Sequence, residues 1–221
     1  MTEAEWLESD DPYLLLDVQR TRANDQQLPP RARARFSSKQ VGLWIVACCR
    51  QNEELMEGEG TRERAAVEWA ERVLGSAIEC AEAWEPSDAD PYRMGAAAYR
   101  CLSVAHCVLG GDDAVAVSLA REALELLLDV DAEPYLLFCD LLRDIVGNPF
   151  RPVTFFPSWR TSTAVTLASQ MYESREFGAM PILADALQDA GCDNADALDH
   201  CRGPGPHVRG CWVVDMVLGK E

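Results

Sequence analysis

The sequence predicts an all-α protein, a multi-helix bundle of antiparallel helices with one ordered loop rich in proline and aromatic residues. Apolar residues recur at steps of three and four along almost the whole chain, which is the period of an amphipathic helix. No sustained stretch shows the two-residue alternation and β-branched enrichment of a strand. Glycine, proline and N-cap residues divide the chain into pieces of helical length.

The first two expected helices are short and begin at clear N-terminal signals. Thr2 and Glu5 have the spacing of a capping box, in which each side chain bonds the other residue's backbone. Asp11 stands before Pro12, and proline is favoured at the first position of a helix. We therefore expect one helix containing Trp6 and a second containing Leu14.

Longer helices follow, and glycine or proline separates them. The stretch 24–30 breaks the pattern with two prolines, and further breaks fall at 58–60, 85–90, 110–111 and 147–149. The short connections at 86–91 and 110–111 predict that three successive helices run antiparallel. The expected ranges are 31–57, 61–84, 91–109, 112–130 and 134–146.

Residues 148–157 are the one irregular segment with a distinct composition. Three prolines exclude a helix, whereas Phe150, Phe155, Phe156 and the nearby Trp159 are too apolar for a solvated linker. We expect an ordered loop that packs on the helices. Four short helices are expected after it, at 161–172, 181–190, 194–201 and 207–218, with Gly191 and Gly219 as C-terminal stops.

Length and composition favour one globular domain. The 221 residues are 48% hydrophobic and 26% charged, which is ordinary for a folded protein that buries a sizeable core. No solvated linker divides the chain. We therefore predict a single helical domain over 1–221, in which 1–146 and 158–221 are candidate subdomains joined by the ordered loop 147–157.

The net charge argues against nucleic acid and membrane as partners. The formal charge is −17, which repels phosphate backbones and anionic lipid over most of the surface. The segment 20–39 is an exception, with six basic residues and one acid, but no aromatic residues alternate with its arginines. The longest apolar run, 41–49, is about half of the ~20 residues of a membrane-spanning helix and predicts a buried helix.

Cysteine content and the first residues predict a reducing compartment. Nine cysteines are an odd number for a disulfide framework, so most are expected to be free thiols that pack as small apolar residues. The chain opens with acidic residues and lacks the basic and apolar regions of a signal peptide. Only two of its twenty basic residues are lysines, which favours a GC-rich bacterial genome. We expect a bacterial cytoplasmic protein.

The last thirty residues hold the one cluster of potential metal ligands. Cys192, Cys201, His207 and Cys211 lie around a Gly-Pro-Gly-Pro turn, and His200 is an alternative to Cys201. If a helix begins at residue 207, the side chains at 207 and 211 lie on the same helix face and could bind one zinc ion. Neither Cys-x-x-Cys nor zinc-finger spacing is present. The same residues equally fit a buried core with histidines at helix ends.

Catalytic motifs are absent from the sequence. We find no Gly-x-Ser-x-Gly, no phosphate-binding Gly-x-x-x-x-Gly-Lys and no His-Glu-x-x-His. A thiol enzyme that uses Cys201 with His200 or His207 as base is conceivable on residue types, although spacing alone does not establish it. Acidic pairs such as Asp112 and Asp113 are explained by helix starts.

Three segments resemble a family of uncharacterised bacterial proteins. They are the opening Met-Thr-Glu-Ala-Glu-Trp-Leu, residues 141–153, and Leu183-Ala-Asp-Ala-Leu together with the His-Cys-Arg-Gly-Pro-Gly-Pro-His-Val-Arg-Gly-Cys-Trp-Val-Val-Asp of 200–215. The residues around 29–30 and 44–49 match that family only in part. The resemblance implies a bacterial cytoplasmic setting and no particular activity.

Two hypotheses of different class follow. The first is a non-enzymatic, acidic, helical protein-protein interaction module without a cofactor, which presents the loop 148–159 to a protein partner because aromatic side chains are common binding anchors. The alternative is a zinc-stabilised or thiol-based regulatory domain that uses the C-terminal Cys/His cluster. Oligomeric state, partner identity and the role of the basic segment 20–39 do not follow from the sequence.

Overall fold

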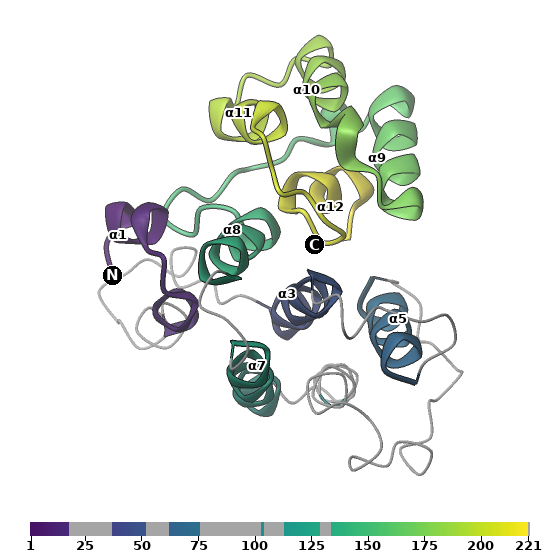
Figure 1. Cartoon of the computed structure of the whole chain (residues 1–221). Helices are drawn as coiled ribbons and strands as arrows, with labels where there is room; N and C mark the ends of the chain where they lie inside the picture. The colour runs from purple at the N-terminus through teal and green to yellow at the C-terminus, as the bar shows by residue number, and fades with distance from the viewer. Residues whose placement is uncertain (18–36, 52–61, 76–102, 104–112, 129–133, 221) are drawn as a thin grey trace.

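The computed structural model describes residues 1–17, 37–51, 62–75, 103, 113–128 and 134–220. Every regular element in this part of the chain is helical and none is a strand, which confirms the all-α class (Figure 1). Residues 12–17 are helical as well. The labelled elements are α1 (Glu3–Glu8), α3 (Ser38–Gln51), α5 (Arg62–Gly75), α7 (Asp113–Leu128), α8 (Pro134–Val146), α9 (Ser162–Ser174), α10 (Met180–Asp189), α11 (Ala195–Arg202) and α12 (Trp212–Leu218), with short 3-10 helices η3 (Pro157–Trp159) and η4 (Phe177–Ala179).

The N-terminal caps form as the sequence predicts. The backbone N–H of Glu5 donates to the Thr2 hydroxyl at 3.2 Å, and the Thr2 N–H donates to the Glu5 carboxylate at 2.7 Å. The Asp11 carboxylate accepts from the N–H of Tyr13 at 2.8 Å, immediately after Pro12. Both short helices therefore begin at their predicted residues.

A first hydrophobic cluster is built around α3, which packs against α5, α7 and α8 (Figure 1). Its residues from Val41 to Cys49 are buried throughout, as expected of an apolar run too short for a membrane. Gly42 allows close approach to α5, because a Cβ there would lie 2.8 Å from the Leu74 side chain. The Trp44 indole donates to the carbonyl of Phe138 at 2.8 Å and fixes α3 on α8.

A second hydrophobic cluster is formed by α9 to α12, in which α10 packs on α11 and α12 on α9. Side-chain caps open two of these helices, with Thr161 accepting from Ala164 at 3.2 Å and Asn194 accepting from Ala197 at 2.9 Å. Gly219 ends α12 in the left-handed conformation that the sequence predicts for a glycine stop.

The loop between the clusters is ordered, with only the short η3 turn at its end. Trp159 is buried in the second cluster, and Phe155 and Phe156 meet its ring edge-on at centroid distances of 5.2 and 5.0 Å. Phe150 instead packs on the first cluster. Phe156 is 53% exposed. The expectation of a loop packed on the helices is thus met, with one aromatic ring left largely in solvent.

One predicted helix start is wrong. A helix was expected from residue 207, but α12 begins at Trp212. Gly205 and Gly210 adopt φ of +84° and +94°, which is incompatible with a right-handed helix. Gly210 also lies against α3, where a Cβ would come 2.9 Å from the Leu43 side chain. The segment 203–211 is therefore a loop that packs on the first cluster.

Other expectations fall wholly or partly outside the described residues. The predicted helix 91–109 is described only at Ser103, and the helix expected at 61–84 only over α5. The helix expected at 31–57 is wrong at Ser37, which is not helical: its hydroxyl accepts from the N–H of Gln40 at 3.2 Å and α3 begins at the next residue. The antiparallel order of the three central helices stays a prediction. None of the helices described is both long enough and apolar enough to cross a lipid bilayer.

Candidate metal centre

Four potential metal ligands from distant parts of the chain meet between the two hydrophobic clusters. Asp144 lies on α8, His200 on α11, His207 in the loop 203–211, and Cys211 is the N-cap residue of α12. One ligand atom from each lies within 4.8 Å of all the others. This set is a possible metal-binding cluster, and we call these four residues the metal cluster.

Asp144 is the centre of the metal cluster. Its Oδ1 accepts from Nδ1 of His207 at 2.7 Å and lies 3.1 Å from Nε2 of His200. Its Oδ2 accepts from the backbone N–H of Val208 at 3.0 Å. Burial raises the pKa of the Asp144 carboxyl, but hydrogen bonds and charge from the two histidines outweigh burial, so the net pKa is lowered. A carboxylate is therefore the stable form at this position.

The rings and the loop hold these ligand atoms in place. His200 Nε2 lies 3.3 Å from Cys211 Sγ, and the His200 ring packs on Trp212 at a centroid distance of 5.2 Å. The N–H of Cys211 donates to the carbonyl of Val208 at 3.0 Å, which closes the turn that brings Cys211 back toward α8. Tertiary packing thus positions the cluster from both sides.

The Cys211 side chain is fully buried. Whether its sulfur is a thiol or a thiolate depends on whether a metal ion is bound. Burial, and then the charge of Asp144, raise the pKa of its thiol well above the ordinary value. Without a metal the sulfur keeps its proton at neutral pH. A metal ion binds the thiolate and displaces that proton, which is the usual coupling between metal binding and deprotonation.

The residues present fit a zinc ion. With Zn–N and Zn–O near 2.0–2.1 Å, tetrahedral geometry places two such ligands about 3.4 Å apart. The observed separations of 2.7, 3.1 and 3.3 Å are hydrogen-bonded distances, so the closest pair would have to open by roughly 0.7 Å and any pair near the 4.8 Å limit of the cluster would have to close. Nε2 of His207 is buried without a hydrogen-bond partner in the described part of the chain. Because Nδ1 is the His207 atom that faces Asp144, this unsatisfied Nε2 is a separate feature of the ring and adds nothing to the ligand distances above.

His200 has the most exposed side chain of the metal cluster. Asp144 and His207 side chains are 2% and 8% exposed, whereas His200 is 19% exposed. His200 also lines a cavity of about 410 Å³, together with Trp6, Asn148 and Trp212. His207 in turn lines a second cavity, so the metal cluster borders two hollows in the described part of the chain.

The structure brings together two of the four residues that the sequence singled out. His207 and Cys211 belong to the metal cluster. Cys192 and Cys201 are buried among the apolar side chains of the second hydrophobic cluster. Burial raises the pKa of the Cys201 thiol to about 12. The six cysteines in the described residues, Cys48, Cys49, Cys139, Cys192, Cys201 and Cys211, are all free and buried, as expected of apolar thiols.

Sequence reasoning missed Asp144 and treated His200 as an alternative. Asp144 lies in α8 between Leu141, Leu142 and Ile145, which are all fully buried. An acidic residue on the apolar face of an amphipathic helix was a usable signal, because a buried carboxylate requires a partner. The spacing of residues in the sequence does not show which residue is the partner of Asp144.

Comparisons with known proteins found no match. No protein-family model matches this sequence, and neither the curated proteins nor the solved structures contain a significant relative of it.

Proposed function

We propose that this protein is a non-enzymatic helical regulatory domain that is stabilised by a zinc ion. The observation that carries the proposal is the convergence of Asp144, His200, His207 and Cys211 within 4.8 Å. These residues belong to α8, α11 and the loop leading to α12, so the ion would tie the two hydrophobic clusters together. Metal supply would then control how firmly α11 and α12 are held on α8.

The donor set favours zinc over harder cations. One sulfur, two imidazole nitrogens and one carboxylate oxygen are ligands that zinc accepts together, whereas calcium and magnesium select oxygen. A thiolate also requires a reducing environment. The six free cysteines of the described residues support a reducing compartment, and we propose the bacterial cytoplasm.

The closed form of the site supports a structural role. Structural zinc sites use four protein ligands, whereas catalytic sites keep one position open for water or substrate. Here four protein groups converge, and three of them are almost completely buried. When bound, the ion would supply cross-linking between elements, and the His200 and Trp212 rings would exclude water from it.

Metal analysis of the purified full chain tests the proposal. We expect about one equivalent of zinc per chain, and a fall in Tm of roughly 5–10 °C on chelation. Asp144→Asn removes the central carboxylate and should lose most of the zinc. Asp140→Asn is the matched control, because Asp140 lies on the same helix but is 51% exposed.

Two results would contradict the zinc proposal. Less than about a tenth of an equivalent of zinc, iron or copper in the unmodified protein, with no Tm shift on chelation, would leave the cluster as a hydrogen-bonded Asp-His-His network. Equal zinc content in Asp144→Asn and the unmodified protein would also contradict it.

A second candidate function is binding of a protein partner through the loop 148–159. The exposure of Phe156 favours it, because an aromatic side chain held at 53% exposure on an ordered loop is a suitable anchor. A photo-crosslinking residue at position 156 in producing cells should capture one defined protein. The same residue at position 136, where Leu136 is 62% exposed, is the control. Equal products from both positions would contradict this role.

A further inference from the structure

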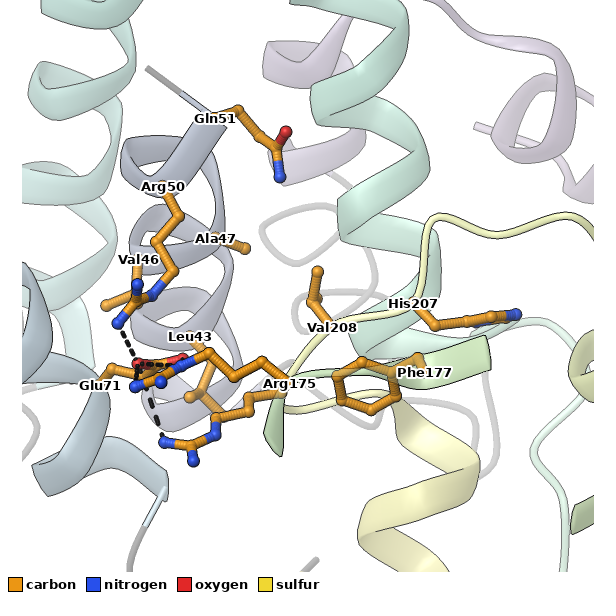
Figure 2. A pocket seen from close by; sticks show the side chains of 11 residues that line it. Leu43, Val46, Ala47, Arg50, Gln51, Glu71, Arg175, Phe177, His207 and Val208 are labelled. Carbon is orange, nitrogen blue, oxygen red and sulfur yellow. Dashed lines mark hydrogen bonds and ion pairs between the residues drawn. The ribbon is translucent and has the colours of Figure 1, made fainter. Parts of the chain in front are cut away.

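A cavity of about 220 Å³ lies between α3, α5 and the loop 203–211 (Figure 2), and His207 of the metal cluster is one of the residues on its lining. Three arginines and one carboxylate line it, together with an apolar wall that includes Leu43, Val46 and Phe177. We call it the arginine pocket. The arginines are Arg50, Arg175 and Arg209, and the carboxylate is that of Glu71.

Glu71 organises the charged side of the pocket. Its carboxylate is 4% exposed and accepts from Nε and Nη2 of Arg175 at 3.1 and 2.7 Å, and also from Nη2 of Arg50. Arg209 lies farther away, with Nη1 3.8 Å from the same carboxylate. Figure 2 shows the guanidinium groups of Arg50 and Arg175 at the Glu71 carboxylate.

The described lining of the pocket carries more positive than negative charge. Three arginines against one glutamate leave a formal excess of two positive charges, in a chain whose net charge is −17. Nε of Arg50 is buried and has no hydrogen-bond partner within the described residues. Burial, together with the charges of Arg175 and Arg50, lowers the pKa of Arg209 against the opposing effect of Glu71.

We propose that the arginine pocket binds a small organic anion. Its carboxylate or phosphate group contacts the three arginines, and its short apolar part lies against Leu43, Val46 and Phe177. Arginine guanidinium groups recognise both oxyanions through paired N–H donors. The volume is below the about 300–1,000 Å³ of pockets for drug-sized ligands, which selects a small ligand.

Neutralisation of Glu71 alone does not explain the arrangement. Arg175 already engages this carboxylate through two nitrogens, and Arg50 adds a third donor. Arg209 directs Nε and Nη2 to the carbonyls of Tyr172 and Glu173 at the end of α9 instead. Its charge is thus fixed at the pocket by backbone contacts, without a carboxylate of its own at hydrogen-bond distance among the described residues.

Thermal shift of the purified full chain at constant ionic strength tests the proposal. The probes are hexyl phosphate, hexanoate and inorganic phosphate, with hexylammonium as the cationic control. We expect dissociation constants on the order of 0.1–1 mM for the two organic anions and a Tm increase of roughly 3–5 °C at ten times that concentration. The ratio between hexyl phosphate and hexanoate identifies the preferred oxyanion.

Arg50→Gln should weaken binding of the preferred anion about tenfold or more, because it removes charge-assisted donors. Arg64→Gln is the matched control, since Arg64 lies on α5 in an exposed pair with Glu68 and should bind within about twofold of the unmodified protein. Should Arg50→Gln not fold, phenylglyoxal labelling of the unmodified protein replaces it. Bound hexyl phosphate should then protect Arg50 and Arg175 in the peptide mass spectrum, and leave Arg64 unprotected.

Three results would overturn the proposal. One is the absence of a saturable shift with every anion, and another is an equal shift with hexylammonium. Equal affinity for inorganic phosphate and hexyl phosphate would exclude an organic ligand that uses the apolar wall. None of these readouts measures metal content, so failure of this proposal is distinguishable from failure of the zinc proposal.

Discussion

Nδ1 of His207 lies 2.7 Å from Oδ1 of Asp144, across 63 positions of sequence. This contact joins the loop before α12 to α8, and the neighbouring Val208 N–H bonds the second oxygen of the same carboxylate. The buried acid of one hydrophobic cluster is thereby satisfied by residues that belong to the other half of the chain. The same contact is the core of the proposed zinc site.

X-ray absorption at the zinc edge should distinguish the two ligand sets. The metal cluster predicts one sulfur near 2.3 Å and three nitrogen or oxygen ligands near 2.0–2.1 Å. Cys192, Cys201, His207 and Cys211 would instead give three sulfurs. Cys211→Ser should lose most of the zinc, whereas Cys192→Ser, which changes a buried cysteine outside the cluster, should retain it. A spectrum with three sulfurs would refute the assignment of Asp144 and His200.

Replacement of Glu71 by glutamine should destabilise the protein by about 2–4 kcal/mol at pH 7, because three arginines would lose a buried carboxylate. Burial raises the pKa of Glu71, but contacts with Arg175, Arg50 and Arg209 outweigh it, so the net pKa is lowered. A lowered pKa in the folded state contributes stability above the unfolded pKa, and that contribution disappears as pH falls through the folded value.

The measurement is urea unfolding of both proteins between pH 7 and pH 3. The difference in unfolding free energy should be constant from pH 7 down to about 5 and shrink below the ordinary glutamate pKa of about 4.3. Glu68→Gln is the control, because its pair with Arg64 is exposed. A difference that grows as pH falls would contradict the ion-pair explanation.

Gly147 should not tolerate a side chain. Its φ is +72°, and a Cβ would lie 3.2 Å from the Trp212 indole, which in turn packs on His200. Gly147→Ala should cost about 2–3 kcal/mol from backbone strain plus displacement of the ring. Gly191→Ala separates the two causes, since its φ is +87° but nothing lies within 4 Å. It should cost only about 1 kcal/mol, and equal losses in chemical denaturation would mean that the ring contact has no role.

Arg143→Lys should destabilise the protein, although it keeps the positive charge. Its Nε and Nη2 donate to the carbonyl of Trp6 at 3.1 and 3.0 Å, and Nη2 also donates to that of Ser9, so one planar fork caps the end of α1. Arg143→Lys keeps the charge but loses this geometry, at about 1–2 kcal/mol. Hydrogen exchange of residues 3–9 should become faster. Arg64→Lys, in an exposed pair, should leave that exchange unchanged.

Local signals were sufficient for much of the fold. Each of these signals acts within three residues, so it can be recognised without knowledge of distant contacts. They are the capping box at Thr2, the proline after Asp11, and the N-caps Thr161 and Asn194. The helix predicted at 134–146 has the bounds of α8. The helix start predicted at residue 207 failed because Gly210 serves a contact with Leu43, far away in sequence.

Composition and helical periodicity by themselves determined the all-α class, the buried helix at 41–49 and the free, apolar character of the described cysteines. These properties depend on hydrophobic burial and on hydrogen bonds between near neighbours, which the order of residues encodes directly. Only the tertiary structure decided that Asp144 and His200 join His207 and Cys211, and that three arginines surround Glu71. Electrostatic partners are selected by distance in space, and spacing along the chain carries no information about which helix faces meet.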